Sequence, residues 1–346
     1  MPAPDPALLA RWHVRPARAA DLDALLELAA LTGGGFTNLP HDGQALAERI
    51  AWSEESLGVA RAEPEDELYL LVLEERDTGR IGGTASLFSR VGVRWPFYSY
   101  KLTTISLKSR ELERTFRTEV LHLVNDFDGA SEVGGLFLHP DLRAGGLGRL
   151  LAKSRYLFIA GHRARFAKLV LAELRGVIDE GGNAPFWDAI AGRFFGMSFA
   201  EADRFNSLHG NQFIADLMPK YPVYVALLAD DARAVIGQPH PAGRAALALL
   251  EKEGFGFHGY VDIFDGGPTV DAPVDSLETV REATRAEVSA HLSRAAAAET
   301  GLRLVATGRL IGFRAMATQL ALAGPGVAVP GQSGIVLGEE ILHARF

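Results

Sequence analysis

Cysteine is absent from the chain of 346 residues. Without it there can be no disulfide, thiolate zinc site, iron–sulfur cluster or cysteine nucleophile. Long apolar runs are missing too, since no stretch approaches the roughly 18 residues that a transmembrane helix needs. The first twelve residues, which include Pro2, Pro4 and Pro6, lack the basic and apolar segments of a signal peptide. We therefore expect a soluble, cytoplasmic protein that has no membrane partner.

Positive charge is scarce as well. Lys and Arg number 35 against 43 Asp and Glu, which gives a formal net charge of −8. A negative chain repels polyanions, so nucleic acid is not expected as a partner and a small-molecule function is favoured. Hydrophobic residues make up 48% of the sequence, which is enough for a packed core. No cluster of His, Asp or Glu has the spacing of metal ligands, so we expect no metal.

The first 138 residues show the alternation of apolar runs and turn signals that is typical of an antiparallel sheet. A helix is expected after Asp21, because Leu22, Leu25 and Leu26 then share one face. Strands are expected at residues 69–73, 81–88, 98–107, 119–124 and 133–138.

The tail of the chain has a different composition, with short β-like pieces separated by Gly and Pro at residues 303–307, 309–313 and 334–337. An alanine-rich stretch at residues 287–299 is expected to be helical. At about 150 residues per domain, the length allows two domains or one enlarged domain with an appendage. We expect an N-terminal extension (1–12), a core (13–270) and a small β-rich C-terminal subdomain (271–346).

A glycine-rich loop follows the last strand of this meander. Its residues are Arg143-Ala144-Gly145-Gly146-Leu147-Gly148, and a helix is expected next. Glycines let a backbone approach an anion closely, and the unpaired N–H groups of a helix's first turn bind phosphate oxygens. The pattern R-x-x-G-x-G therefore suits a pyrophosphate, whereas G-x-x-x-x-G-K-[ST] and G-x-G-x-x-G are not matched. Taken alone, the six residues would also fit a glycine turn that binds nothing.

The context of the loop narrows its meaning. An antiparallel meander, this loop, a helix, a strand and a late A-x-x-L-L-E-K-x-G-F segment at residues 246–255 together resemble the GNAT superfamily of N-acyltransferases. The resemblance implies an α+β fold with a mixed, mostly antiparallel sheet flanked by helices. It also implies that the loop holds the CoA pyrophosphate, and that a β-bulge in the preceding strand places the thioester against backbone N–H groups. The donor-binding residues so implied are Leu136, Leu138, Arg143, Gly145, Gly146 and Gly148.

Seven blocks of sequence follow one another in a specific order. They are TGGGFTNLP (32–40), LFL (136–138), RGVIDE (175–180), PFW (185–187), VIGQPHP (235–241), LEKEGF (250–255) and DIFDGGPT (262–269). Together they resemble the arginine N-succinyltransferase family, whose members carry a C-terminal β subdomain on a GNAT core. The resemblance implies transfer of succinyl from succinyl-CoA to the α-amine of L-arginine, the first step of a bacterial arginine catabolic route. It is weakest in the tail of the chain.

The reaction that this resemblance implies needs a residue that acts as general acid. Direct attack of an amine on a thioester requires a neutral nucleophile, donors for the oxyanion and an acid for the leaving thiolate. In many GNAT enzymes a tyrosine near the E-K-x-G-F turn is this acid, but Leu250 stands at the matching position. His240, between Pro239 and Pro241, is the better candidate because imidazole titrates near neutral pH, and the family resemblance implies the same role. Tyr260 is the reserve acid.

The charged groups of both substrates also need partners. Carboxylates would pair with a guanidinium, and Arg with the carboxylates of succinyl and the amino acid. Glu173, Arg175 and Asp179 lie at the end of one predicted strand, although a solvated strand end would look the same. Thr37 and Asn38 follow three glycines in a loop that usually borders the acceptor in GNAT folds. We expect these five residues to bind substrate.

The sequence therefore predicts an N-succinyltransferase of this family, or one subunit of one, that binds succinyl-CoA and L-arginine in a ternary complex. Succinyl-CoA would be a co-substrate, and no resident cofactor is expected. Ornithine as the acceptor is the nearest alternative, and a non-catalytic acyl-CoA-binding subunit is the alternative of another class. A homo-oligomer or pairing with a paralogous subunit is compatible with the sequence.

Overall fold

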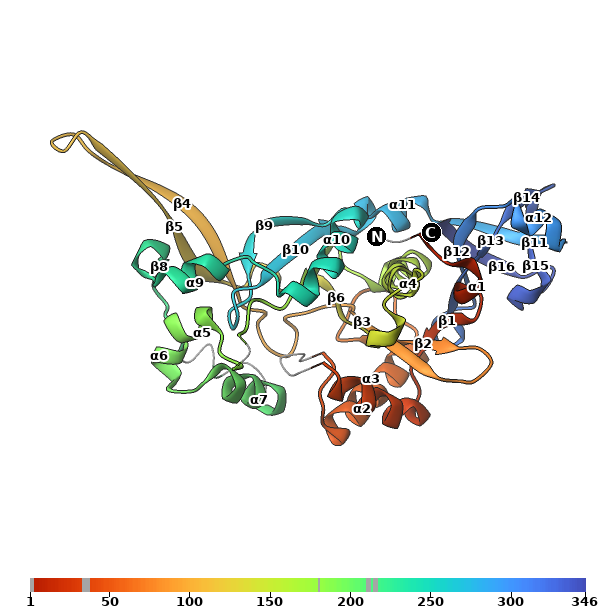
Figure 1. The fold of residues 1–346 in the computed structure, drawn as a ribbon, viewed down its shortest axis with the longest axis horizontal. Helices are drawn as coiled ribbons and strands as arrows, with labels where there is room; N and C mark the ends of the chain where they lie inside the picture. Colours follow the sequence, from red (N-terminus) through yellow and green to blue (C-terminus); the bar gives the residue numbers. More distant parts are fainter. Residues whose placement is uncertain (1–2, 33–37, 180, 210–212, 214–216) are drawn as a thin grey trace. The chain divides into compact units, whose positions relative to one another are not determined.

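The computed structural model describes residues 3–32, 38–179, 181–209, 213 and 217–346. The chain divides into two compact units, each made of stretches that are separate in the sequence (Figure 1). Unit 1 comprises Met1–Ser89, Ser131–Lys168 and Pro273–Phe346, and unit 2 comprises Arg90–Ala130 and Leu169–Ala272. The division expected from the sequence, into residues 1–12, 13–270 and 271–346, stays a prediction. No helix in the described ranges is both long and apolar enough to span a membrane.

Within unit 1 the strand order is β14-β15-β11-β16-β12-β13-β1-β2-β3-β6. Neighbouring strands are antiparallel except for β11 and β15, which are parallel. The strands from β11 onward make the C-terminal part of the chain rich in β-structure. The strands are β1 (Trp12–Pro16), β2 (Leu68–Glu75), β3 (Ile81–Phe88), β6 (Ser131–Leu138), β11 (Thr284–Leu292), β12 (Leu302–Thr307), β13 (Arg314–Gln319), β14 (Ala321–Ala323), β15 (Gly326–Pro330) and β16 (Glu340–Arg345).

Helices cover both faces of the central strands of unit 1, with α2 and α3 on one side of β1–β3 and α4 on the other (Figure 1). Leu25 of α2 and Ile50 of α3 are buried in one cluster with Leu70 and Val72 of β2. The apolar face of each helix thus packs on the sheet, as the helical spacing of leucines indicates. The helices are α1 (Pro6–Leu9), α2 (Leu22–Ala30), α3 (Gly43–Gly58), α4 (Leu147–Gly161), α11 (Glu278–Glu282) and α12 (Arg294–Ala298).

Within unit 2 the strand order is β7-β10-β9-β4-β5-β8, and β4 and β5 form a long hairpin (Figure 1). The core of unit 2 contains Tyr100, Leu121, Phe186, Trp187 and Ile263, which pack the strands against the short helices. The strands are β4 (Ser99–Ser109), β5 (Arg114–Val124), β7 (Leu169–Glu173), β8 (Val223–Tyr224), β9 (Gly256–Val261) and β10 (Pro268–Pro273). The helices are α5 (Pro185–Ala189), α6 (Gly192–Phe195), α7 (Phe199–His209), α9 (Asp230–Val235) and α10 (Arg244–Glu253).

The alanine-rich stretch at residues 287–299 is helical only in its second half, at α12, and the helix predicted for residues 287–292 is wrong. Strand β11 runs to Leu292, and the side chain of Ser293 accepts a hydrogen bond from the N–H of Ala296 at 3.2 Å to cap α12. The strand forms because it pairs with both β16 and β15 and buries Val288 completely. At residues 287–292 pairing and burial outweigh helix propensity, whereas the alanine run that follows keeps its helix in α12.

Two predicted strand pieces of the tail are also wrong. Leu310–Gly312 is a 3₁₀ turn, and the strand that follows it is β13. Residues 334–337 are not a strand either, since they come after β15 and a second 3₁₀ turn. The segments that do form strands pair with a neighbouring strand and bury their residues, as Ala317 of β13 and Val329 of β15 show.

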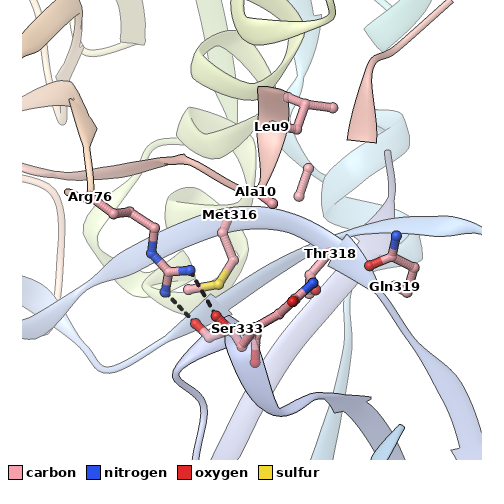
Figure 2. A pocket seen from close by; sticks show the side chains of 9 residues that line it. Leu9, Ala10, Arg76, Met316, Thr318, Gln319 and Ser333 are labelled. Carbon is pink, nitrogen blue, oxygen red and sulfur yellow. Dashed lines mark hydrogen bonds between the residues drawn. The ribbon is translucent and has the colours of Figure 1, made fainter. Parts of the chain in front are cut away.

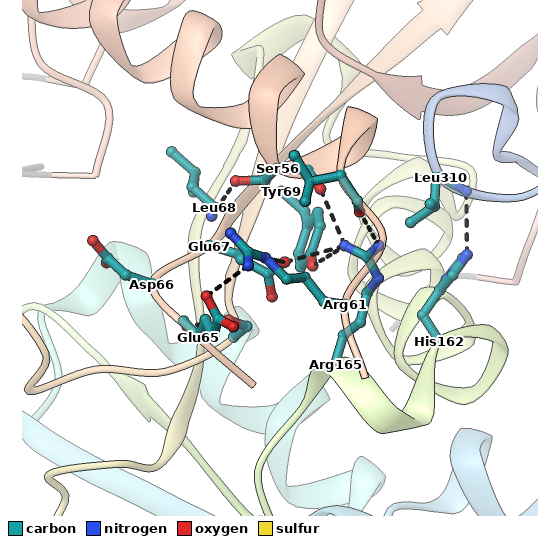
Figure 3. Close-up of polar contacts among 12 residues, drawn as sticks. Ser56, Arg61, Glu65, Asp66, Glu67, Leu68, Tyr69, His162, Arg165 and Leu310 are labelled. Atoms are coloured by element: carbon teal, nitrogen blue, oxygen red, sulfur yellow. Dashed lines mark hydrogen bonds and ion pairs between the residues drawn. The ribbon is translucent and has the colours of Figure 1, made fainter. Parts of the chain in front are cut away.

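A buried guanidinium ties the end of α3 to β2 in unit 1 (Figure 3). Arg165 Nη1 donates hydrogen bonds to the carbonyl of Ser56 at 3.1 Å, Oε1 of Glu67 at 3.2 Å and the hydroxyl of Tyr69 at 3.0 Å. Its Nη2 donates to the carbonyl of Val59. Arg165 is 5% exposed and Glu67 is 3% exposed. Removing one partner of such a pair leaves the other charge buried without compensation.

We predict that Arg165→Met lowers the free energy of unfolding by about 3–5 kcal/mol, because buried Glu67 then keeps only the looser Arg61 contact and the Ser56 carbonyl and Tyr69 hydroxyl lose their donor. Arg61 is the matched control, since it lies 2.9 Å from Glu65 and 3.7 Å from Glu67 but its side chain is 37% exposed. Arg61→Met should cost less than about 1 kcal/mol. Urea unfolding of both variants measures the difference, and equal losses would contradict the buried-pair argument.

Candidate functional site

The glycine-rich loop of unit 1 forms the turn from β6 into α4. Gly145 and Gly146 both have positive φ, at 64° and 97°, a region that side chains other than glycine's rarely adopt. In the described part of the chain, no backbone or side-chain acceptor takes a hydrogen bond from the N–H of Gly146, Leu147 or Gly148. These amides lie at the amino end of a 15-residue helix. The arrangement is that of an anion site for phosphate.

The basic residue of the loop folds back on the strand end. Arg143 is exposed; its Nε donates a hydrogen bond to the carbonyl of Leu138 at 3.3 Å, and its guanidinium carbon lies 5.7 Å from the ring centre of Phe137. These contacts keep the positive charge at the end of β6, in the loop that leads into α4. Arg143 therefore stands where it can add a charge to the amides of the loop.

Strand β6 contains the bulge that precedes the loop. Its register with β3 pairs Phe137 with Thr84 and Gly134 with Ser86, so Gly135 and Leu136 together face one residue of β3. Gly135 has φ of 58°, and a Cβ there would lie 2.6 Å from the Ser86 hydroxyl. Leu136 and Leu138 are half-buried on the face opposite Phe137, which is in the core. They offer an apolar track that leads to the loop.

A carboxyl group that the sequence analysis missed lies on the same strand. Glu132 is 7% exposed, and its Oε1 accepts a hydrogen bond from Nδ2 of Asn38 at 3.2 Å. Burial raises the pKa of Glu132 to about 7, although the Asn38 bond and the charge of Arg49 act in the other direction. A charged residue within the apolar strand SEVGGLFL is the signal that marks it. A titratable group near neutral pH thus lies three residues before Gly135, the first residue of the bulge.

In unit 2, the candidate acid lies in the turn between α9 and α10. The backbone N–H of His240 donates to the carbonyl of Arg175 at 2.8 Å. Its Nδ1 accepts a hydrogen bond from the N–H of Ala242 at 3.2 Å, which assigns the ring hydrogen of the neutral imidazole to Nε2. Burial lowers the pKa of His240, and the charge of Arg175 adds to the effect. The side chain is therefore neutral at neutral pH, with Nε2 as its donor.

The strand end beside this histidine is fixed by a buried aspartate. Oδ2 of Asp265 accepts from the N–H of Gly176 at 2.7 Å and Oδ1 accepts from the N–H of Gly267 at 2.8 Å. Burial, and after it the neighbouring Asp262, raises the pKa of Asp265. The DIFDGGPT block is therefore a tight turn that holds the backbone after β7, and this backbone in turn holds His240.

The predicted substrate-binding residues of unit 2 have different surroundings. Nε of Arg175 is buried and has no hydrogen-bond acceptor within the described ranges. Glu173 accepts from the Thr269 hydroxyl at 3.4 Å. Asp179 is exposed, and its carboxylate closes a local turn by accepting from the N–H of Asn183 at 2.8 Å and from its Nδ2 at 2.9 Å, which lowers the pKa of Asp179. Of the three, Arg175 has the buried, unsatisfied donor that an anionic ligand would satisfy.

The reserve acid is engaged elsewhere in unit 2. The Tyr260 hydroxyl donates to Oδ2 of Asp126 at 2.8 Å, and the Lys101 ammonium lies 3.7 Å from the centre of its ring. Burial, together with Asp126, raises the pKa of Tyr260 to about 12. A hydroxyl that is already hydrogen-bonded to a carboxylate and has a raised pKa is a poorer acid than His240.

The structure thus brings the predicted residues together in two groups. Leu136, Leu138, Arg143, Gly145, Gly146, Gly148 and Asn38 belong to unit 1, whereas Glu173, Arg175, Asp179 and His240 belong to unit 2. Thr37 lies outside the described residues. Their roles in binding and catalysis stay predictions.

Comparison with known proteins identifies the family. The model of the arginine N-succinyltransferase beta subunit family matches residues 12–279. An arginine N-succinyltransferase of Enterobacter sp. (strain 638) is 44% identical over 303 residues, which cover 88% of this chain and 87% of that protein. The arginine N-succinyltransferase subunit beta of Pseudomonas aeruginosa is 44% identical over 269 residues, or 78% of each chain.

A solved structure supports the same assignment. Arginine/ornithine succinyltransferase subunit AI from Pseudomonas aeruginosa superposes with a TM-score of 0.85 at 32% identity, over 97% of this chain and 98% of that chain. The expected α+β fold of GNAT type, with a β-rich C-terminal part, is confirmed. The family match covers the loop, the bulged strand and the histidine turn together. The chain therefore belongs to the arginine N-succinyltransferase family of acyltransferases.

Proposed function

We propose that this protein transfers the succinyl group of succinyl-CoA to the α-amine of L-arginine by direct attack in a ternary complex. The observation that carries the proposal is the loop from Arg143 to Gly148, in which the amides of Gly146, Leu147 and Gly148 have no hydrogen-bond acceptor among the described residues and follow the apolar track of Leu136 and Leu138. The names of the relatives support the same acyl group and acceptor. Succinyl-CoA is a co-substrate here, and the reaction needs no resident cofactor. A cytoplasmic location, and pairing with a second subunit as the name of one relative suggests, belong to this proposal.

On the donor side, the loop amides and Arg143 bind the pyrophosphate of CoA, and Leu136 and Leu138 contact the pantetheine arm. The thioester then lies at the bulge of β6, where backbone N–H groups around Leu136 stabilise the oxyanion that forms on attack. The amine nitrogen bonds to the carbonyl carbon, the C–S bond breaks, and CoA leaves as a thiolate that takes up one proton. Direct transfer requires no covalent enzyme intermediate.

His240 delivers that proton. Because its pKa lies below the usual value, the imidazole is neutral at neutral pH and must gain a proton before it can give one. The α-ammonium of the acceptor must lose a proton to become a nucleophile, so one proton can pass from the amine to the thiolate through this ring. In the resting ring Nδ1 is the acceptor and Nε2 carries the hydrogen. The ring therefore gains the amine's proton at Nδ1, in place of the Ala242 bond, and gives the hydrogen on Nε2 to the thiolate.

We predict that succinyl-CoA is a better donor than acetyl-CoA by at least about tenfold in kcat/KM, since a charge-assisted bond to the distal carboxylate contributes about 1.5–3 kcal/mol. Arg175→Ala should reduce this preference toward unity. Initial rates over a grid of succinyl-CoA and acetyl-CoA with arginine and ornithine test the proposal. Equal rates with both donors in the unaltered protein would refute the succinyl assignment, and absence of turnover would favour a non-catalytic acyl-CoA-binding subunit.

For the acid, we predict that His240→Ala lowers kcat by about 10²-fold, the lower end of general-acid effects, because a thiolate is already a tolerable leaving group. KM for both substrates should change much less. Tyr260→Phe is the matched control and should keep kcat near normal, since its hydroxyl is bound to Asp126. Release of free thiol measures both variants. A crippled Tyr260→Phe beside a near-normal His240→Ala would transfer the role to the tyrosine.

The buried Glu132 gives a prediction of pH dependence. Its pKa of about 7 in the folded protein exceeds the ordinary 4.5, so the folded state keeps a proton that the unfolded state loses. The stability that this group contributes is full below pH 4.5 and declines by about 3 kcal/mol as the pH rises to about 7. Glu132→Gln should remove this decline. Urea unfolding of both proteins between pH 4 and pH 8 measures the difference, and parallel curves would mean that Glu132 titrates normally.

A further inference from the structure

The segment before β1 packs directly on the glycine-rich loop. Residues 4–9 precede the stretch that the family model matches, which begins at residue 12. The N–H of Asp5 donates to the carbonyl of Gly145 at 2.9 Å. A Cβ at Gly145 would lie 2.5 Å from Cδ2 of Leu8, so the leucine side chain occupies the space beside that glycine. The segment therefore contacts the left-handed turn from which the unpaired amides project.

The same segment contacts the next glycine through two further residues. A Cβ at Gly146 would lie 3.3 Å from Cβ of Pro4 and 3.5 Å from Cδ1 of Leu9. Leu9 is completely buried. Both glycines of positive φ thus have one side covered by residues 4–9, and the conformation that presents the amides is held by packing as well as by the glycines themselves.

The segment is itself anchored. The Asp5 carboxylate accepts from the N–H of Ala7 at 2.9 Å and that of Leu8 at 3.2 Å, so its charge is satisfied by the first turn of α1. Figure 2 shows Leu9 and Ala10 beside a cavity of about 20 Å³ that β13 and Arg76 also line. The cavity is only large enough for about one water molecule, which means that the segment sits closely against its surroundings.

The chain runs from this segment directly into the sheet, and a backbone hydrogen bond fixes the junction. The carbonyl of Arg11 accepts from the N–H of Arg76 at 2.8 Å, and β1 begins at the next residue, Trp12. The segment cannot move away from the loop without loss of these contacts. A loop with three glycines and no such contacts would sample many backbone conformations, and binding of a phosphate would then cost much conformational entropy. Contacts with residues 4–9 reduce that cost.

We propose that residues 4–9 hold the loop in its anion-binding conformation, and that Asp5 and Leu8 are positioning residues for the acyl donor. The inference rests on the proposed function, since it takes the anion to be the CoA pyrophosphate. It assigns to the segment a role in donor affinity and none in the chemical step.

The test uses Leu8→Ala and Asp5→Ala, each in the full-length protein. Calorimetry with CoA should show a dissociation constant raised by about five- to tenfold, because part of the binding free energy is then used to order the loop. Leu322→Ala, which truncates a side chain that is 89% exposed on β14, is the matched control and should bind CoA normally.

A second readout separates this role from a general loss of structure. Succinyl-pantetheine is a thioester donor without the pyrophosphate, so its kcat/KM should be unchanged in Leu8→Ala, while that for succinyl-CoA falls about five- to tenfold through KM. The KM for arginine at saturating donor should also stay the same. An equal loss with both donors would overturn the proposal.

The remaining outcomes are also decisive. If the unaltered protein binds CoA but both variants bind it equally well, the segment has no positioning role and the proposed function stands. If the variants bind CoA more tightly, the segment covers the anion site instead of shaping it, and the proposal is again overturned. If the unaltered protein does not bind CoA, the proposed function fails together with the inference.

Discussion

The donor side of this protein depends on one backbone constraint, the change of direction between β6 and α4. The chain must leave an extended strand, pass two residues of positive φ at Gly145 and Gly146, and enter a helix of 15 residues. Only glycine meets that requirement without strain, and the result is a helix end whose first amides have no internal partner. The bulge at Gly135 and Leu136 also interrupts the regular pairing of β6 with β3 just before this turn. A bulged strand and a helix end with unpaired amides thus lie within one short stretch of the chain, residues 135–148.

Unit 2 meets a comparable constraint with buried charge. The carboxylate of Asp265 is bonded to two backbone N–H groups, one of which belongs to Gly176 at the end of β7. Without the aspartate these donors would be buried and unsatisfied, which costs about 1–3 kcal/mol each. The carbonyl one residue earlier, that of Arg175, holds the backbone of His240. The backbone position of His240 is therefore linked, through Arg175 and Gly176, to the buried carboxyl group of Asp265, which places the blocks around residues 175, 240 and 265 side by side.

The sequence predicted the parts of this arrangement that are encoded locally. Strand periodicity located β2, β3 and β6, and glycine spacing located the loop, because both patterns follow from backbone geometry within a few residues. The alanine-rich segment was misjudged, since β11 forms only through its pairing with β15 and β16, which lie more than thirty residues away in the chain. Glu132 was missed for a related reason. Its burial and its bond to Asn38, 94 residues away, depend on how distant strands and loops assemble.

The carboxylates predicted to bind the acceptor have surroundings in the folded chain that their sequence does not reveal. Glu173 and Asp179 were equivalent in the sequence as carboxylates that could pair with a guanidinium. In the folded chain, Asp179 directs both oxygens to Asn183, so a bidentate pair with a guanidinium would have to break the turn at residues 179–183. Glu173 lies on β7, and its Oε1 accepts a hydrogen bond from the hydroxyl of Thr269 at 3.4 Å. A planar guanidinium gains more from two fixed oxygens than the compact ammonium of ornithine does. Asp179 and Glu173, which look alike in the sequence, are therefore in different states in the folded chain, since the carboxylate of Asp179 is committed to the Asn183 turn.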